Sequence, residues 1–210
     1  MATGAAADSR RRAAVACGLG AAALAVVVTV LGGAAQTGYS HAAQFISELG
    51  AAGALNAGLV RALGFAPIGA LVVAFVILAR ASFPPVPATN LGVACFGAVG
   101  VAYLAAAVFP CDVGCPSSGS VSQMLHNVFG LLEYVGAIAG LRFMALAFRG
   151  SAAWRSLAPV CLVVAFLVGL AFVAMLAPEL GEYRGASQRV ADGAIFLWIA
   201  WVSLSLRELG

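Results

Sequence analysis

Six long apolar segments, separated by short polar stretches, make up nearly the whole chain. Each apolar segment has roughly 20 residues, the length that an α-helix needs to cross the hydrocarbon core of a bilayer. The pattern therefore predicts an all-α, polytopic integral membrane protein, with one domain of six transmembrane helices over residues 13–207. Short cytoplasmic tails, residues 1–12 and 208–210, are expected on either side. The predicted spans cover residues 13–35, 57–79, 89–109, 122–147, 157–177 and 190–206.

Composition supports a membrane protein and excludes a soluble domain of useful size. Hydrophobic residues make up 63% of the 210 residues and charged residues only 9%, whereas soluble domains average about 25% charged residues. The net charge of +3 is small and scattered, so we expect membrane lipids as partners and no nucleic acid. Within the fourth span, Gly136-xxx-Gly140 is a spacing typical of close helix packing.

The first apolar segment also has the outline of a secretory signal. Arg10–Arg12 precede it, and Ala-Ala-Gln at 34–36 is similar to a weak cleavage site. Its apolar run of about 23 residues is longer than the apolar region of an ordinary signal peptide. We therefore favour a first transmembrane helix, with the signal peptide as the alternative.

The basic residues divide unequally between the two sides of the predicted bundle. All eleven are arginine, and if odd spans run outward and even spans return, eight fall on the side of the termini. Cytoplasmic loops carry such an excess in membrane proteins, so we expect a plasma-membrane protein with both termini in the cytoplasm. The eight are Arg10, Arg11, Arg12, Arg80, Arg142, Arg149, Arg155 and Arg207, and the three on the outer side are Arg61, Arg184 and Arg189.

The outer loops and the helix ends beside them hold most of the unusual polar residues. His126 and Glu133 are seven positions apart, so they lie on one face of the fourth span, about 10 Å apart along its axis. A carboxylate inside a membrane helix normally faces a cavity or a partner. We therefore predict an outward-facing pocket lined by His126 and Glu133, with Asp112 and Glu48 at its mouth. The alternative is that Glu133 is a protonated or paired packing residue and His126 marks the start of a helix.

Four further residues are candidate ligand-binding groups of the same pocket: Ser47, His41, Arg61 and Arg189. Arg61 is expected to pair with Glu48 or Asp112 across the pocket. Arg189 and Asp192, at i and i+3, are alternatively a structural ion pair. Asp112 is alternatively a residue that only shapes its turn.

Cysteine placement predicts a disulfide rather than a metal site. Cys111 and Cys115 fall on the outer, oxidising side, where disulfides persist, and Gly114 gives the short loop between them its backbone freedom. A metal held by their thiolates is the weaker alternative, and another is a metal bound by His41, His126 and Asp112. No zinc spacing occurs in the sequence, so neither a metal nor a cofactor is expected.

Further segments carry a resemblance: Tyr39-Ser40, Ile46–Ala51, Phe109–Pro116, His126 and Gly185…Gln188-Arg189. Together they resemble a family of prokaryotic membrane proteins called domain of unknown function 998. The resemblance implies a six-span membrane protein and implies no activity. A shorter element, Ile46–Gly50, is also faintly similar to an Ile-Ser-Asp-Thr-Gly element in a eukaryotic family that includes lipid-anchor remodelling membrane proteins.

Three functions follow from the predicted pocket. The favoured one is a binding or structural membrane protein for a lipid or small ligand, because it requires only the spans and the pocket. The second is an intramembrane hydrolase or transferase acting on lipids, with His126 as general base, oriented by Asp112, Glu48 or Glu133. Its nucleophile would be Ser47 or Ser122, if either lies within hydrogen-bond reach of His126. The third is a small transporter, against which no span is broken at mid-depth.

Overall fold

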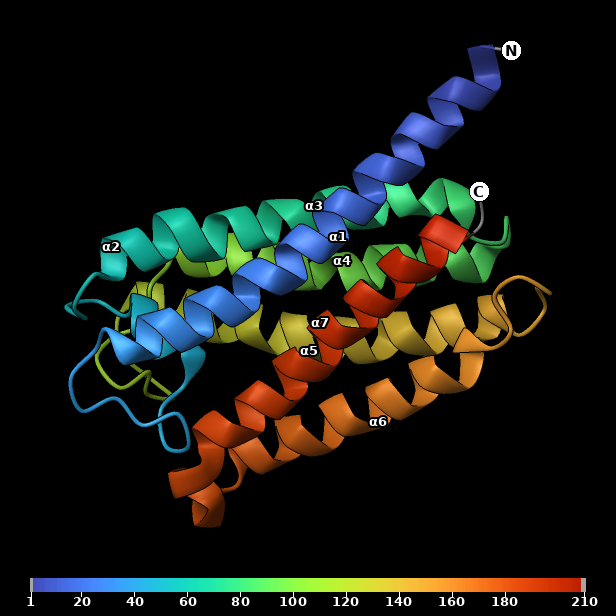
Figure 1. Cartoon of the computed structure of the whole chain (residues 1–210). Helices are drawn as coiled ribbons and strands as arrows, with labels where there is room; N and C mark the ends of the chain where they lie inside the picture. The colour runs from blue at the N-terminus through green and yellow to red at the C-terminus, as the bar shows by residue number, and fades with distance from the viewer. Residues whose placement is uncertain (1, 209–210) are drawn as a thin grey trace.

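The computed structural model of the protein describes residues 2–208 as a bundle of long helices (Figure 1). Met1, Leu209 and Gly210, which belong to the predicted tails, lie outside the described residues. Residues 2–208 contain no strand. The elements in chain order are α1 (Ala2–Ala34), η1 (Ile46–Gly50), α2 (Ala57–Leu59), η2 (Val60–Phe65), α3 (Ala66–Ala79), η3 (Arg80–Ser82), α4 (Pro87–Val108), α5 (Val121–Phe148), α6 (Leu157–Leu176), η4 (Pro178–Tyr183) and α7 (Arg184–Glu208).

Six helical segments are long and apolar enough to cross a membrane, which confirms the predicted all-α, six-span bundle. The second of them is composite: α2, a π-helical turn η2 and α3 follow one another without a break. Both ends of the chain lie at one end of the bundle, and the loops that precede α2 and α5 lie at the other end (Figure 1). We call these the terminal end and the loop end.

Two helices, α1 and α7, begin more than one turn before the predicted spans. The helix α1 starts at Ala2, because its first turns are rich in alanine, the strongest helix former. There Arg11 Nη2 also donates to Asp8 Oδ1 over 3.0 Å, one turn away. The predicted tail of residues 1–12 is therefore helical from Ala2 onward. Likewise α7 starts at Arg184 rather than near residue 190, because the 3₁₀ turn η4 leads directly into it.

Small residues bring α4 and α5 into close contact, as the spacing of Gly136 and Gly140 predicted. A Cβ atom on Gly136 would lie 2.6 Å from the carbonyl oxygen of Cys95, and one on Gly140 would lie 2.7 Å from the backbone nitrogen of Phe96. Neither position has room for a larger side chain. The prediction that this motif packs two helices together is confirmed.

Aromatic packing fills the terminal end of the bundle. The rings of Phe148 and Trp154 stack with centroids 5.0 Å apart, and Phe83 packs edge-on against both. Trp154 Nε1 donates to the carbonyl oxygen of Ser82 over 3.1 Å, which ties the two connections at this end together. The buried acids and the long polar loops gather toward the loop end instead.

Candidate functional site

A small polar cavity lies inside the bundle toward the loop end. It measures about 60 Å³, enough for roughly four to six water molecules if each occupies about 10–15 Å³. Five elements, η1, η2, α4, α5 and α7, contribute to its wall. The polar residues that line it are Ser47, Tyr103, His126, Glu133, Tyr134, Gln188 and Asp192.

Asp192 joins three helices at the wall of this cavity. Its carboxylate accepts hydrogen bonds from the hydroxyl groups of Tyr134 on α5, at 3.0 Å, and Tyr103 on α4, at 3.3 Å. Only 4% of Asp192 is exposed. The two tyrosines therefore hold a buried acid that α7 carries into the centre of the bundle.

Glu133 lines the same cavity, but its carboxyl group has fewer hydrogen-bond partners than that of Asp192. The residue is 9% exposed, and its Oε1 atom is buried without a hydrogen-bond partner among the described residues. A buried polar atom without a partner is rare in proteins and costs about 1–3 kcal/mol. The cavity therefore contains an acceptor that no side chain or backbone group of residues 2–208 satisfies.

His126 lies half-buried on the same face of α5 as Glu133. Its Nδ1 is 3.0 Å from the carbonyl oxygen of Phe109, and because a carbonyl only accepts, Nδ1 carries the proton of this bond. The ring is thereby held in place, and Nε2 remains for other partners. His126 also lines a second hollow of about 150 Å³, the vestibule, which shares Ser47, Gly130, Tyr134 and Gln188 with the cavity. The vestibule lies beside the loops, because its wall includes Phe45, Cys115 and Asn127.

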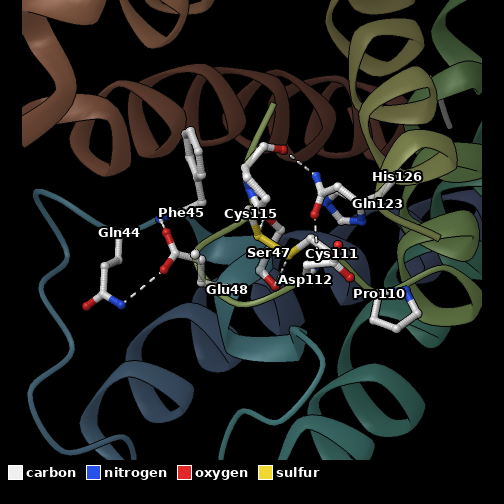
Figure 2. Close-up of a disulfide and its surroundings, with 12 residues drawn as sticks. Gln44, Phe45, Ser47, Glu48, Pro110, Cys111, Asp112, Cys115, Gln123 and His126 are labelled. Carbon is white, nitrogen blue, oxygen red and sulfur yellow. Dashed lines mark hydrogen bonds between the residues drawn. A yellow bond between two sulfur atoms is a disulfide. The ribbon is translucent and has the colours of Figure 1, made fainter. Parts of the chain in front are cut away.

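Asp112 lies apart from the cavity, so its predicted place at the pocket mouth is wrong. Its carboxylate accepts from the backbone N–H of Ser120 and from the Ser120 hydroxyl, both over 2.8 Å. These two bonds lower the pKa of Asp112 below its usual value. Ser120 in turn accepts from Gln123 N–H and caps α5. Asp112 thus shapes the loop that begins α5 (Figure 2).

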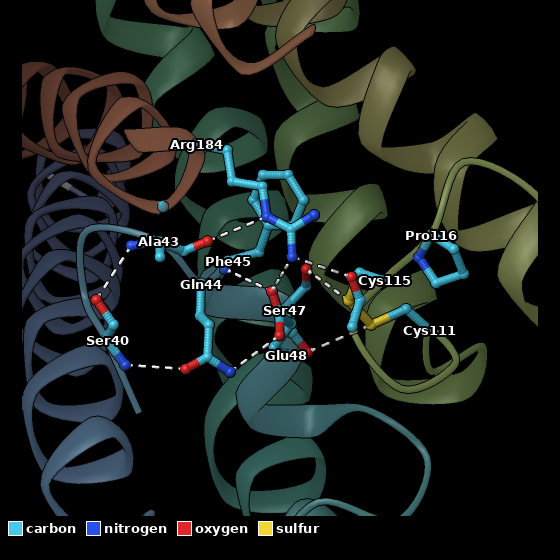
Figure 3. A network of polar contacts seen from close by, with 12 residues as sticks. Ser40, Ala43, Gln44, Phe45, Ser47, Glu48, Cys111, Cys115, Pro116 and Arg184 are labelled. Atoms are coloured by element: carbon cyan, nitrogen blue, oxygen red, sulfur yellow. Dashed lines mark hydrogen bonds and ion pairs between the residues drawn. A yellow bond between two sulfur atoms is a disulfide. The ribbon is translucent and has the colours of Figure 1, made fainter. Parts of the chain in front are cut away.

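Glu48 pairs with Arg184, and the predicted pairing with Arg61 is wrong. Arg184 Nη2 lies 3.1 Å from Glu48 Oε1, and the Glu48 side chain is only 6% exposed. The same guanidinium donates to the carbonyl oxygens of Ala43 and Gly114, so it ties three chain segments together (Figure 3). Glu48 also accepts from the backbone of Phe45 and from the side chain of Gln44. Glu48 is therefore a structural anchor of the loop end and does not line the cavity.

Arg189 binds neutral groups, so the predicted ion pair with Asp192 is also wrong. It donates to His41 Nδ1, to the hydroxyl of Tyr39 and to the carbonyl oxygens of Gln44 and Gly185. Within residues 2–208 no carboxylate oxygen lies within 4.0 Å of it. Burial raises the pKa of Tyr39 above its usual value, against the opposing effect of Arg189. His41 thus lies in this cluster, away from His126.

Cys111 and Cys115 form a disulfide, with Cα atoms 5.0 Å apart (Figure 2). The two sulfur atoms and a ring nitrogen of His126 lie within 4.8 Å of one another. Bonded sulfurs are not thiolates and do not act as metal ligands in this state. The alternative set of His41, His126 and Asp112 is not brought together in the described part of the chain.

Neither predicted nucleophile contacts His126. The Ser122 hydroxyl donates to the carbonyl oxygen of Pro110 over 2.7 Å. The Ser47 hydroxyl lies 3.5 Å from the Cys115 sulfur, although Ser47 shares the cavity wall with His126. The hydrogen bond that a serine hydrolase needs between nucleophile and base is therefore not formed in residues 2–208.

The sequence interpretation missed both tyrosines of the cavity wall, Tyr103 and Tyr134. Both are almost fully buried within apolar helices, at 7% and 5% exposure. A signal was present, because a phenol hydroxyl inside a membrane helix requires a hydrogen-bond partner. Of the residues predicted to form the site, the structure brings Ser47, His126 and Glu133 together. It places His41, Glu48, Arg61, Asp112 and Arg189 outside the cavity wall.

Six apolar helices around a buried polar cavity define an all-α polytopic membrane protein. The family model that describes a protein of unknown function, DUF998, matches residues 19–205 of the chain, and the protein belongs to this family. No curated protein and no solved structure matches it.

Proposed function

We propose that the protein is a ligand-binding membrane protein whose cavity takes a small cationic ligand, a protonated amine. The observation that carries this proposal is the buried Oε1 atom of Glu133, which lines the cavity without a hydrogen-bond donor. An ammonium group supplies three N–H donors and the opposite charge. Membrane proteins place ionisable residues inside their spans at sites of this kind.

The charge of the cavity wall favours a cation over an anion. Glu133 and Asp192 both face the cavity, and no arginine lines it. Arg184 is paired with Glu48, and Arg189 is held by the cluster around Tyr39. An anionic ligand would meet two carboxylates and no opposing charge, whereas a cation would meet both acids.

Orientation and access form part of the same proposal. The excess of arginine at the terminal end favours termini in the cytoplasm of a plasma-membrane protein, which turns the loop end outward. A ligand would then reach the cavity from outside through the vestibule, whose wall includes His126 and Gly130. Hydrogen bonding of His126 to Phe109 fixes the ring at this passage.

A binding function requires fewer structural features than a lipid hydrolase or a transporter does. A lipid hydrolase needs a nucleophile beside His126, and both candidate serines have other contacts. A transporter typically has a helix interrupted near mid-membrane, whereas α4, α5, α6 and α7 are continuous. These observations favour ligand binding over the two alternatives.

Calorimetric titration of the protein in nanodiscs with methylamine and ethylamine tests the proposal. We expect saturable binding to the wild type and binding at least about tenfold weaker in Glu133→Gln, because a hydrogen bond to a charged group contributes about 1.5–3 kcal/mol. Glu182→Gln, at an exposed position in η4, is the matched control and should bind as the wild type does. Absence of amine binding to the wild type, or equal binding by Glu133→Gln, would contradict the proposal.

A further inference from the structure

A second hollow, the α1–α7 groove, runs between the first and last helices of the bundle. It has a volume of about 420 Å³, much larger than the polar cavity. Aliphatic and small side chains form most of its wall, among them Ala22, Val26 and Val30 from α1 and Leu197 and Ala200 from α7. Both helices are predicted to span the bilayer, so the surroundings of this groove are hydrocarbon chains.

One end of the groove carries a positive charge. Arg189 lines the groove and lies near the start of α7, beside the loops. Its partners are a phenol hydroxyl, an imidazole nitrogen and two carbonyl oxygens. The imidazole nitrogen of His41 accepts this bond, so it carries no proton and His41 adds no charge. Within residues 2–208 no carboxylate oxygen lies within 4.0 Å of the guanidinium. Asp192 also lines the groove, but its carboxylate is buried and held by the hydroxyl groups of Tyr103 and Tyr134.

The donor geometry of Arg189 also leaves a position for an anion. A guanidinium has five N–H donors, and four of them are used by the contacts above. The fifth, on Nη2, has no partner in the described residues. Because the other four bonds fix the group, it is ordered before any ligand arrives, which lowers the entropy cost of binding.

We infer that the α1–α7 groove binds an acyl chain of an anionic phospholipid, with the phosphate of the headgroup on Arg189. Apolar matching alone does not select an occupant in a bilayer, since the surrounding lipid tails are as apolar as the groove. Selection therefore comes from the headgroup, where arginine pairs well with phosphate oxygens. The lipid would lie with its phosphate beside the loops and its chain along Val26 and Leu197 toward the bilayer centre.

This lipid site is distinct from the amine cavity, although Ile46, Tyr103 and Asp192 line both. Gly193 lies on the groove wall and not on the cavity wall, and a Cβ atom added there would meet nothing within 4 Å. A larger side chain at this position is therefore expected to extend into the groove rather than into the packed core. Gly193→Leu should therefore abolish lipid selection and leave amine binding unchanged.

Photocrosslinking in nanodiscs tests the inference directly. The bilayer is phosphatidylcholine with a minor fraction of phosphatidylglycerol that carries a photoreactive acyl chain, and a parallel sample carries the same chain on phosphatidylcholine. We expect roughly tenfold more labelling by the anionic probe, on peptides of α1 and α7 that include Val26 and Leu197. Arg189→Gln and Gly193→Leu should each reduce it to the level of the phosphatidylcholine probe.

Controls separate this result from general lipid contact and from misfolding. Gly58→Leu, at an exposed helical glycine that also has open space, should label as the wild type does. Thermal unfolding identifies any variant that fails to fold, and Gly193→Leu keeps the test valid if Arg189→Gln does fail. Equal labelling by both probes, labelling spread over α3 and α6, or wild-type labelling of Gly193→Leu would each overturn the inference. Full competition by glycerophosphate, which has no acyl chain, would overturn the role of the groove.

Discussion

Replacing Arg184 by methionine is expected to destabilise the protein by about 3–5 kcal/mol. Glu48 is buried, and its ion pair with Arg184 supplies its compensating charge. Removing one partner of a buried pair leaves an uncompensated charge, which costs about this much. Arg184 also holds Ala43 and Gly114 through its other N–H groups. For a chain of this size the loss corresponds to a melting temperature lower by roughly 6–20 °C.

The matched control for this prediction is Arg61→Met. Arg61 is also partly buried near the loop end, but it has no carboxylate partner within 4.0 Å in residues 2–208. We expect a change of less than about 1 kcal/mol for it. Thermal unfolding of both variants in the same detergent compares their melting temperatures. Similar losses of stability in the two variants would show that the Glu48–Arg184 pair contributes no special stability. Double replacement, Glu48→Gln with Arg184→Met, should recover part of the loss.

Gly140→Leu is expected to have the second largest effect, a loss of about 3 kcal/mol or more. A Cβ atom at Gly140 would lie within 3 Å of the nitrogen, Cα and Cβ atoms of Phe96. These atoms belong to the backbone and stem of α4, so α4 must move away from α5 to accommodate a side chain. Overpacking a core typically costs about 1–3 kcal/mol of stability. Displacing a helix backbone costs more free energy than displacing a flexible side chain, so we expect a loss at or above the upper end of this range.

Gly130→Leu, on the same helix, is the control for Gly140→Leu. Nothing lies within 4 Å of a Cβ atom at Gly130, so the same change of residue type should leave the stability unchanged or slightly raised, since leucine forms helices better than glycine. Denaturation in mixed micelles compares the two variants. A Gly140→Leu protein as stable as Gly130→Leu would show that α4 and α5 do not need this close approach.

The sequence was sufficient to predict the six spans because each helix must supply about 20 apolar residues to cross a bilayer. The first residue of each helix was harder to predict from the sequence. The start of α1 depends on alanine-rich helix propensity and on the Asp8–Arg11 pair, whereas our prediction relied on the first apolar residue. Close packing at Gly136 and Gly140 was predictable, since both glycines recur on one face of one helix.

Part of the candidate site followed from helical spacing, and the rest depended on contacts between distant segments. His126 and Glu133 are seven residues apart on one helix, so their common face could be predicted. Three arginines fall on the side of Glu48, and the sequence does not indicate that Arg184, 136 positions away, reaches it. The tyrosines that hold Asp192 come from α4 and α5. Their hydroxyl groups indicate that each needs a hydrogen-bond partner, but the sequence does not indicate that this partner is Asp192 on α7.

Amine titration of Gly130→Leu tests the central claim most directly. Gly130 lines both the cavity and the vestibule, so a leucine there should fill the passage while both acids and the fold stay intact. We expect wild-type thermal stability together with loss of ethylamine binding, by about tenfold or more, because the ligand and the leucine side chain compete for the same space. Wild-type ethylamine affinity in a stably folded Gly130→Leu protein would contradict it.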